Sequence, residues 1–136
     1  MIIELRPVSP TAKAPDSNFA GDVYLNPIYR GEELSRMIIS LVRFTRARAA
    51  TGTPMRWARP CTSPTAFGLV ATRDDTMIRM RAGDTVYTPP GEEHWHGATA
   101  DNMMCPLAML EGTESGDGTT WLEPVSDEQY AATNKP

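Results

Sequence analysis

The 136-residue sequence predicts an all-β fold, a sandwich or barrel formed around one hydrophobic core. Two observations favour this fold. The chain carries 10 glycines and 12 prolines, which interrupt helices, and its apolar segments are short. No sequence repeat and no change of composition divides residues 1–136, so we expect a single domain.

Six short segments are predicted to be strands, because each combines apolar or β-branched residues with turn residues at its ends. In chain order they are residues 22–29, 36–44, 67–73, 76–81, 84–88 and 94–99. Asp74-Asp75 and Ala82-Gly83 fall between three of these segments, where tight turns are required.

The C-terminal part of the chain is predicted to form the only helix, a short turn that extends through Tyr130. Ser126 and Gln129 have the S-x-x-Q spacing of a capping box, in which each residue accepts a hydrogen bond from the backbone of the other. A short C-terminal helical turn is therefore expected after the strands.

Composition and charge argue against several classes of partner. The formal net charge of -4 and the pI near 5.1 do not fit a nucleic-acid surface, which needs clustered basic residues. No apolar run reaches the ~20 residues of a membrane span. With only Cys61 and Cys105 and no secretory signal, we expect a reduced, cytoplasmic protein without a disulfide framework.

The segment 46–66 breaks the β pattern. It reads RARAATGTPMRWARPCTSPTA, with four arginines, three prolines and no apolar alternation. A structureless loop of this length is unusual inside a compact domain. One interpretation is a mobile surface loop, and the other is that the written residues are not those that the fold requires.

Both histidines of the chain lie in TPPGEEHWHGAT, residues 88–99. On an extended strand His94 and His96 project to the same side, which is how a small β protein presents ligands to a metal. A catalytic metal usually takes three or more protein ligands. The remaining ligands must therefore come from another part of the chain.

The stretch GDTVYTPPGEEH resembles the second motif of the cupin superfamily, a glycine, five residues, then Pro-x-Gly-x-x-His. Gly83, Pro89, Gly91 and His94 occupy the four fixed positions. The family usually has Asn four residues after this histidine, where the chain has Ala98, as in small cupins with the sequence HWHGA. The resemblance implies a cupin fold, a jelly-roll-like double-stranded β-barrel.

The first cupin motif should lie upstream and supply the other ligands, but the segment 46–66 contains no histidine. That motif is Gly, five residues, His-x-His, three or four residues, Glu or Gln, six residues, Gly. Read one base earlier, the codons of the segment allow TPGARSNWHTHALGQTLHVTDGF over positions 45–67, which contains the complete motif. Because tryptophan has a single codon, the shifted reading forces a glycine at position 58.

We therefore expect a frameshift over residues 46–66, with one base lost near the start of the segment and one gained near its end. The positions written Thr53, Met55 and Arg59 would then be His, His and Gln. If the written residues are real, these ligands are absent.

With the frame restored, the chain from about Phe19 to Tyr130 resembles the small single-domain cupins typified by the manganese-dependent hydroxynitrile lyases. The resemblance implies that the residues at positions 53, 55 and 59 join His94 as metal ligands, with Mn²⁺ or Fe²⁺ as the cofactor. No metal is expected if the written segment is real.

The same resemblance assigns His96 as a base beside the metal and Val42 to an apolar pocket, and Glu92 could orient a ligand. Pro106 stands where these proteins commonly carry a pocket histidine. Because proline cannot donate to the sheet ladder, Pro106 predicts a sheet edge, a bulge or a further error there. Three methionines are expected in the core rather than in the site: Met103, Met104 and Met109.

The function expected from these features is metal-assisted cleavage of a carbon-carbon bond in a small-molecule substrate, of the hydroxynitrile lyase type. Three alternatives stay open: an Fe-dependent dioxygenase, a non-catalytic ligand-binding cupin, and a metal-free pseudo-cupin if the written segment is real. We also expect a homodimer or higher homo-oligomer, because small cupins often pair their outer strands, and no nucleic-acid or membrane partner.

Overall fold

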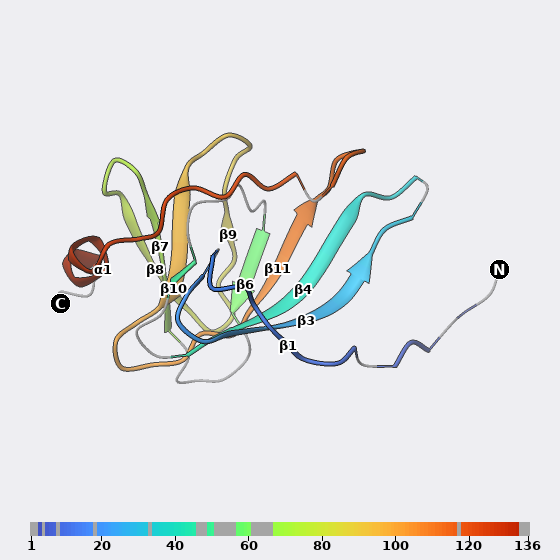
Figure 1. Ribbon diagram of the computed structural model, residues 1–136, viewed down its shortest axis with the longest axis horizontal. Coiled ribbons are helices and arrows are strands. Elements are labelled where there is room, and N and C mark those ends of the chain that lie inside the picture. The colour runs from blue at the N-terminus through green and yellow to red at the C-terminus, as the bar shows by residue number, and fades with distance from the viewer. Residues whose placement is uncertain are drawn as a thin grey trace.

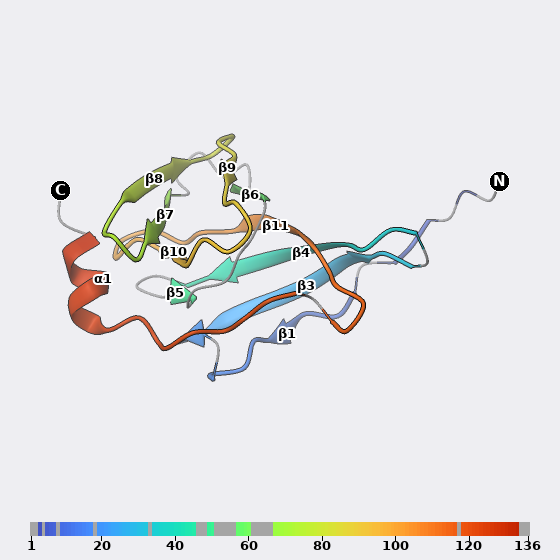
Figure 2. The same cartoon turned by 90° about the horizontal axis from the view of Figure 1, so that it is seen from above.

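The fold consists of two β-sheets that face each other, and one short helix follows them (Figure 1). The computed structural model describes residues 3, 5–7, 9–17, 19–32, 34–45, 49–50, 57–60, 67–116 and 118–133. Seen from above, the strands separate into two layers with the helix at one end (Figure 2). The predicted all-β class is confirmed.

The larger sheet has six strands and the smaller has five. The order in the larger sheet is β1 (Ala12–Lys13), β3 (Val23–Arg30), β4 (Met37–Phe44), β11 (Pro106–Glu111), β6 (Trp57–Pro60) and β9 (Val86–Tyr87). The order in the smaller sheet is β2 (Phe19–Ala20), β5 (Ala49–Ala50), β10 (His94–Ala98), β7 (Phe67–Thr72) and β8 (Met77–Arg81). Both sheets pair strands that are distant in sequence, as in β4 with β11 and β5 with β10, which is the pattern of a jelly roll.

All six predicted strands are present, with ends that differ by at most two residues from the predicted ones. Sequence reasoning did not assign β11, although it lies between β4 and β6 in the larger sheet. Two short strands, β5 and β6, lie within the segment 46–66, so the interpretation of the whole segment as a surface loop is wrong.

Both predicted turns are found where strands reverse. Asp75, between β7 and β8, has φ 65°, and Gly83, between β8 and β9, has φ 91°. These are left-handed conformations, which glycine adopts freely and aspartate tolerates better than most residues. The turn residues therefore fix the spacing of β7, β8 and β9.

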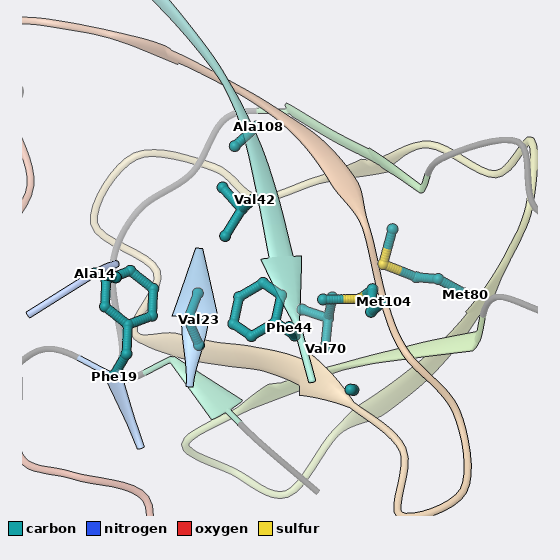
Figure 3. Packing of buried hydrophobic residues seen from close by; sticks show 10 residues of the cluster. Ala14, Phe19, Val23, Val42, Phe44, Val70, Met80, Met104 and Ala108 are labelled. Carbon is teal, nitrogen blue, oxygen red and sulfur yellow. The ribbon is translucent and has the colours of Figure 1, made fainter. Parts of the chain in front are cut away.

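The main core lies between the two sheets (Figure 3). Phe44, on β4, is 0% exposed, and its ring centroid lies 6.2 Å from that of Phe19. Burying a side chain of this size stabilises a fold by roughly 1.5–3 kcal/mol. The buried cluster consists of Ala14, Phe19, Val23, Val42, Phe44, Val70, Met80, Ala98, Met104 and Ala108.

The three methionines expected in this core have different environments. Met104 is 1% exposed and belongs to the cluster, whereas Met103 is 53% exposed. Met109 is half-buried on β11. Met104 is in the core as predicted but also lines the cavity beside the two histidines, and the prediction is wrong for Met103. The two differ because neighbouring residues of an extended chain face opposite sides.

A second apolar cluster covers the outer face of the smaller sheet, where the C-terminal helix α1 (Asp127–Thr133) packs. The ring centroids of Trp95, on β10, and Tyr130, on α1, are 6.1 Å apart. The hydroxyl of Tyr130 donates a hydrogen bond to the carbonyl of Ala98 at 2.5 Å. The helix thereby holds β10 from outside the barrel.

The predicted capping box begins this helix. The Ser126 amide donates to Oε1 of Gln129 at 2.9 Å, and the Gln129 amide donates to Oγ of Ser126 at 3.1 Å. Two backbone donors that a helix N-terminus leaves free are thus satisfied. Among the described residues, no helix has the length and apolar character needed to cross a membrane.

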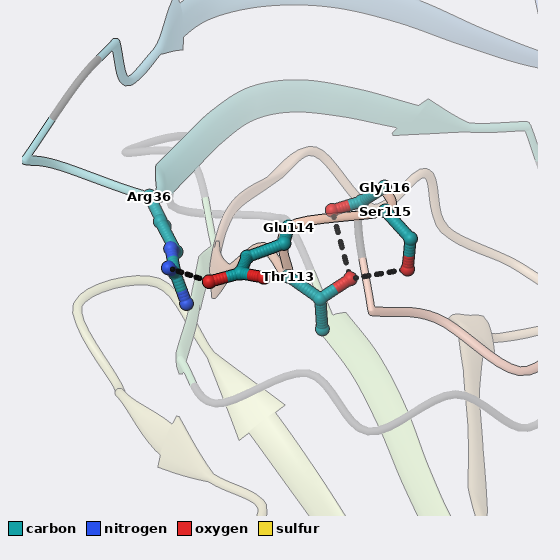
Figure 4. Close-up of polar contacts among 5 residues, drawn as sticks. All are labelled: Arg36, Thr113, Glu114, Ser115 and Gly116. Carbon is teal, nitrogen blue, oxygen red and sulfur yellow. Dashed lines mark hydrogen bonds and ion pairs between the residues drawn. The ribbon is translucent and has the colours of Figure 1, made fainter.

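At the other end of the molecule an ion pair joins the β3–β4 connection to the turn after β11 (Figure 4). A guanidinium nitrogen of Arg36 lies 2.9 Å from Oε1 of Glu114. The Thr113 amide donates to the carbonyl of Gly116 at 2.8 Å and closes the turn. Both charged side chains are exposed, so the pair contributes only about 0–1 kcal/mol.

Candidate active-site cavity

The strand β10 places both histidines on the inner face of the smaller sheet. Because side chains alternate along a strand, His94 and His96 share one face and Trp95 takes the other, against the helix. His94 is 4% exposed and His96 is 5% exposed. Their rings are stacked, with centroids 5.9 Å apart and an interplanar angle of 28°.

A small cavity of about 10 Å³ adjoins the two imidazoles. The other described residues that line it are Val70, Met80, Val86, Thr88, Met104 and Pro106. A volume near 10 Å³ holds about one water molecule or one bare ion. The site is therefore a small, mostly apolar space with two imidazoles on its wall.

Hydrogen bonding fixes the tautomer of His94. Its Nδ1 lies 3.1 Å from the carbonyl oxygen of Glu92, and only a protonated Nδ1 can donate to that oxygen. Burial lowers the pKa of His94, against a smaller opposing effect of Glu92. The ring is therefore neutral near pH 7 and carries its lone pair on Nε2. It is the main chain of Glu92 that orients this histidine.

His96 is in a drier environment. The edge of the Phe44 ring packs on it at a centroid distance of 5.2 Å. Burial, with a smaller contribution from the nearby His94, lowers the pKa of His96 to about 3. Its Nδ1 is buried and has no hydrogen-bond partner among the described residues. A buried polar atom without a hydrogen-bond partner lowers the stability of a fold by about 1–3 kcal/mol. The unpartnered nitrogen of His96 therefore indicates a ligand-binding position.

The two predicted pocket residues differ in their relation to the cavity. Val42, on β4, is 5% exposed and packs in the main core, and it is not among the described residues that line the cavity. Pro106 lines the cavity and is fully buried. It is the first residue of β11, a position that proline tolerates inside a sheet, so neither the predicted edge nor a bulge is needed.

Sequence reasoning missed several of the cavity residues. Met80 is 1% exposed on β8, and Thr88 is 7% exposed just after β9. The alternation in TMIRMR gives Met80 a face but does not say which face is inside. Thr88 has no sequence signal, because only the position of β9 beside β6 brings it inward.

Of the three further positions predicted as metal ligands, 53 and 55 lie outside the described residues. Arg59 belongs to β6, where its backbone lies opposite Leu107 of β11. In the described part of the chain no three His, Cys, Asp or Glu side chains gather where they could hold one metal ion. Threonine, methionine and arginine, as written, do not complete a site for Mn²⁺ or Fe²⁺ with His94, since hard cations take oxygen and imidazole ligands.

Comparison with known proteins identifies the family. The chain is 31% identical over 122 residues to (R)-mandelonitrile lyase from Granulicella tundricola, a match that covers 88% of this chain and 91% of the relative. No family model matches the sequence.

Solved structures agree on the fold. A cupin-like protein from Thermotoga maritima superposes with a TM-score of 0.80 at 18% identity, covering 98% of each chain. A cupin-2 domain protein from Rhodospirillum rubrum superposes with a TM-score of 0.62 at 14% identity, covering 97% of this chain and 84% of that one. A polyketide cyclase from Streptomyces resistomycificus superposes with a TM-score of 0.64 at 10% identity, covering 100% of this chain and 95% of that one. This chain belongs to the cupins.

Proposed function

We propose that this protein is a small-molecule lyase that cleaves a cyanohydrin such as mandelonitrile into an aldehyde and hydrogen cyanide. The observation that carries the proposal is the 31% identity to (R)-mandelonitrile lyase over most of both chains. The two inward-facing imidazoles of β10 are consistent with it, because cyanohydrin cleavage requires transfer of the hydroxyl proton.

The proton-transfer role falls to His96. In the proposed reaction, a ring nitrogen of His96 accepts the hydroxyl proton, the carbon-cyanide bond breaks, and its electron pair leaves with cyanide. The proton then passes to cyanide, which gives hydrogen cyanide and restores the neutral ring. His94 stays fixed by the carbonyl of Glu92 and keeps its Nε2 lone pair for a ligand.

The low basicity of His96 limits this reaction. A base with a pKa of about 3 accepts a proton from an alcohol only weakly, since the most effective base has a pKa near the working pH. The cavity of about 10 Å³ is also too small for mandelonitrile unless side chains such as Met104 move. We therefore expect slow turnover from the chain as written.

The metal-dependent form of the proposal depends on the residues at positions 46–66. If the reading frame is restored, histidines at positions 53 and 55, glutamine at 59 and His94 would hold Mn²⁺ or Fe²⁺. Such an ion supplies Lewis acidity, which lowers the pKa of a bound hydroxyl. A chain with the written threonine, methionine and arginine should bind neither ion stoichiometrically.

Peptide mass spectrometry of segment 46–66, together with metal analysis of the purified protein, tests the frame. Restored masses with about one Mn²⁺ or Fe²⁺ per chain support the metal-dependent form. Written masses with stoichiometric binding of either ion would contradict our ligand assignment. If the peptide masses match the printed sequence and neither ion is bound, the metal-free lyase, with its weaker expected activity, is the form to assay.

The lyase proposal itself is tested by release of cyanide from mandelonitrile without oxygen. We expect cleavage by the natural chain and a loss of about 10²–10⁴-fold in His96→Ala, as for removal of a general base. In metal-loaded protein of restored mass, His96→Ala should keep the ion, whereas a His94 substitution should lose ion and activity together.

Pro106 offers a second test of the same site, because its ring lines the cavity. Pro106→His would add an imidazole there, and we expect it to raise a weak lyase activity. No cleavage by either chain would refute the proposal. Oxygen uptake on a flavonol or diketone would then indicate an oxygenase, and tight ligand binding without turnover would indicate a binding protein.

A further inference from the structure

We propose that the cavity beside β10 binds a soft monovalent metal ion, Cu⁺ or its redox-inert analogue Ag⁺, through two imidazoles and two thioethers. The ligands are His94, His96, Met80 and Met104, all of which line the same cavity. This proposal does not rest on lyase activity or on the identity of residues 46–66, because all four ligands lie in the described part of the chain.

The two methionines supply soft donors from different segments of the chain. Met80 comes from β8, and Met104 forms an isolated bridge with Phe44 of β4. Each is 1% exposed, and both residues line the cavity that the two imidazoles adjoin. A thioether is a poor hydrogen-bond acceptor but a good ligand for Cu⁺, which prefers soft sulfur donors.

The imidazoles are in the protonation state that a metal requires. Because Nδ1 of His94 donates to the carbonyl of Glu92, its Nε2 is unprotonated and free to coordinate. His96 brings a second neutral ring, and its buried Nδ1 lacks a hydrogen-bond partner among the described residues. This unpartnered nitrogen is an observation independent of the methionines that also points to a ligand.

The charge of the site favours a monovalent ion. The other described lining residues are Val70, Val86, Thr88 and Pro106, so the described wall carries no carboxylate. The Born cost of burying an ion increases with the square of its charge, so a divalent ion would cost about four times as much as a monovalent one. Neutral soft donors therefore suit Cu⁺ better than Mn²⁺ or Fe²⁺.

The volume of the site fits a bare ion. A cavity of about 10 Å³ has room for one ion without a hydration shell, but not for an organic ligand. Cu⁺ binds with few ligands and without retained water, whereas Mn²⁺ and Mg²⁺ favour water and oxygen ligands. Four protein donors around a cavity of this size therefore suit the proposed ion.

Binding of Ag⁺ is measured by native mass spectrometry, and affinity for Cu⁺ by anaerobic competition with a coloured Cu⁺ chelator. Both are done in a Cys61→Ser/Cys105→Ser chain, because thiolates bind these ions strongly. We expect one ion per chain in this background. Absence of binding, or dependence of binding on the cysteines, would overturn the proposal.

Ligand variants assign the site. Met80→Leu and Met104→Leu keep an apolar side chain of similar volume but remove the sulfur, and each should weaken binding at least about tenfold. Met77→Leu is the matched control, because Met77 lies on the same strand as Met80 but is 37% exposed. The Met77→Leu protein should bind Ag⁺ and Cu⁺ with the same affinity as the parent. Equal affinity in all three variants would contradict the assignment.

Imidazole nitrogens provide a readout that does not depend on affinity. The chain has only two histidines, so in protein labelled with ¹⁵N at histidine the only imidazole nitrogen signals are those of His94 and His96. We expect both sets of signals to shift on addition of one equivalent of Ag⁺. Unchanged histidine signals with a bound ion would place the ion elsewhere and refute the proposal. Because no assay of cyanide release is involved, failure here and failure of the lyase proposal are distinguishable.

Discussion

Substitution of Gly68 by alanine should destabilise the barrel through a single contact. Gly68 lies on β7, opposite Met80 of β8. A Cβ atom at Gly68 would lie 2.0 Å from Sδ of Met104 and 3.0 Å from its Cγ. Ordinary contact begins near 3.4 Å, so the sulfur would have to move by about 1.4 Å.

The expected magnitude follows from the burial of Met104. This side chain is 1% exposed and is packed in the main core, so a shift of that size forces its neighbours to rearrange. Overpacking of a core costs about 1–3 kcal/mol. Alanine recovers about 0.4–1 kcal/mol by restricting the unfolded chain. The net loss in the free energy of unfolding is then roughly 1–2 kcal/mol, or about 3–8 °C in Tm for a domain of this size.

The assay is thermal and urea unfolding of Gly68→Ala beside a matched control, Gly116→Ala. A Cβ at Gly116 meets nothing within 4 Å, so this control should unfold like the parent. In a Met104→Ala background, Gly68→Ala should cost less, because the clashing sulfur is gone. The reasoning is wrong if Gly68→Ala has the same unfolding midpoint as Gly116→Ala. It is also wrong if Gly68→Ala lowers the free energy of unfolding equally with and without Met104→Ala.

Three further predictions concern the helix and the histidines. Ser126→Ala should lower the free energy of unfolding by about 1 kcal/mol, because it removes the acceptor for the Gln129 amide; urea unfolding measures this. Tyr130→Phe should cost about 0.5–1.5 kcal/mol, because it removes the hydrogen bond to the carbonyl of Ala98 and keeps the ring. In metal-free protein, the depressed pKa of His96 means that the unfolded chain binds the proton and the folded chain does not between pH 6.5 and about 3. The contribution of His96 to the free energy of unfolding should be fully present above pH 6.5 and should fall as the pH decreases across that window, by up to about 1.4 kcal/mol per pH unit. Urea unfolding at a series of pH values measures this slope, and His96→Leu should reduce it.

Local patterns in the sequence were sufficient for the parts of the fold that depend on local chemistry. The apolar runs of β3, β4, β7 and β10 and the turn residues between β7, β8 and β9 predicted strands in the right places. The capping box at Ser126 and Gln129 formed as expected, because both partners lie within one helical turn.

The parts that were missed depend on partners distant in sequence. The strands β5 and β6 have two and four residues, and pairing with β10, β9 and β11 defines them rather than their own composition. Proline counted against β11, yet Pro106 only begins that strand. Met80 and Met104 meet at the cavity because the two sheets face each other, which no local pattern states.

The two proposals for the cavity make separate demands on the chain. Metal-assisted cyanohydrin cleavage needs imidazoles at positions 53 and 55, so the residues actually present in segment 46–66 decide it. The soft-ion site needs only His94, His96, Met80 and Met104, which line one described cavity. A chain with the written segment would lose a hard divalent ion but keep these four neutral donors. We expect such a chain to bind Ag⁺ but not Mn²⁺, and its Met104→Leu variant to bind no Ag⁺. This result would show that the four donor side chains determine which ion is bound.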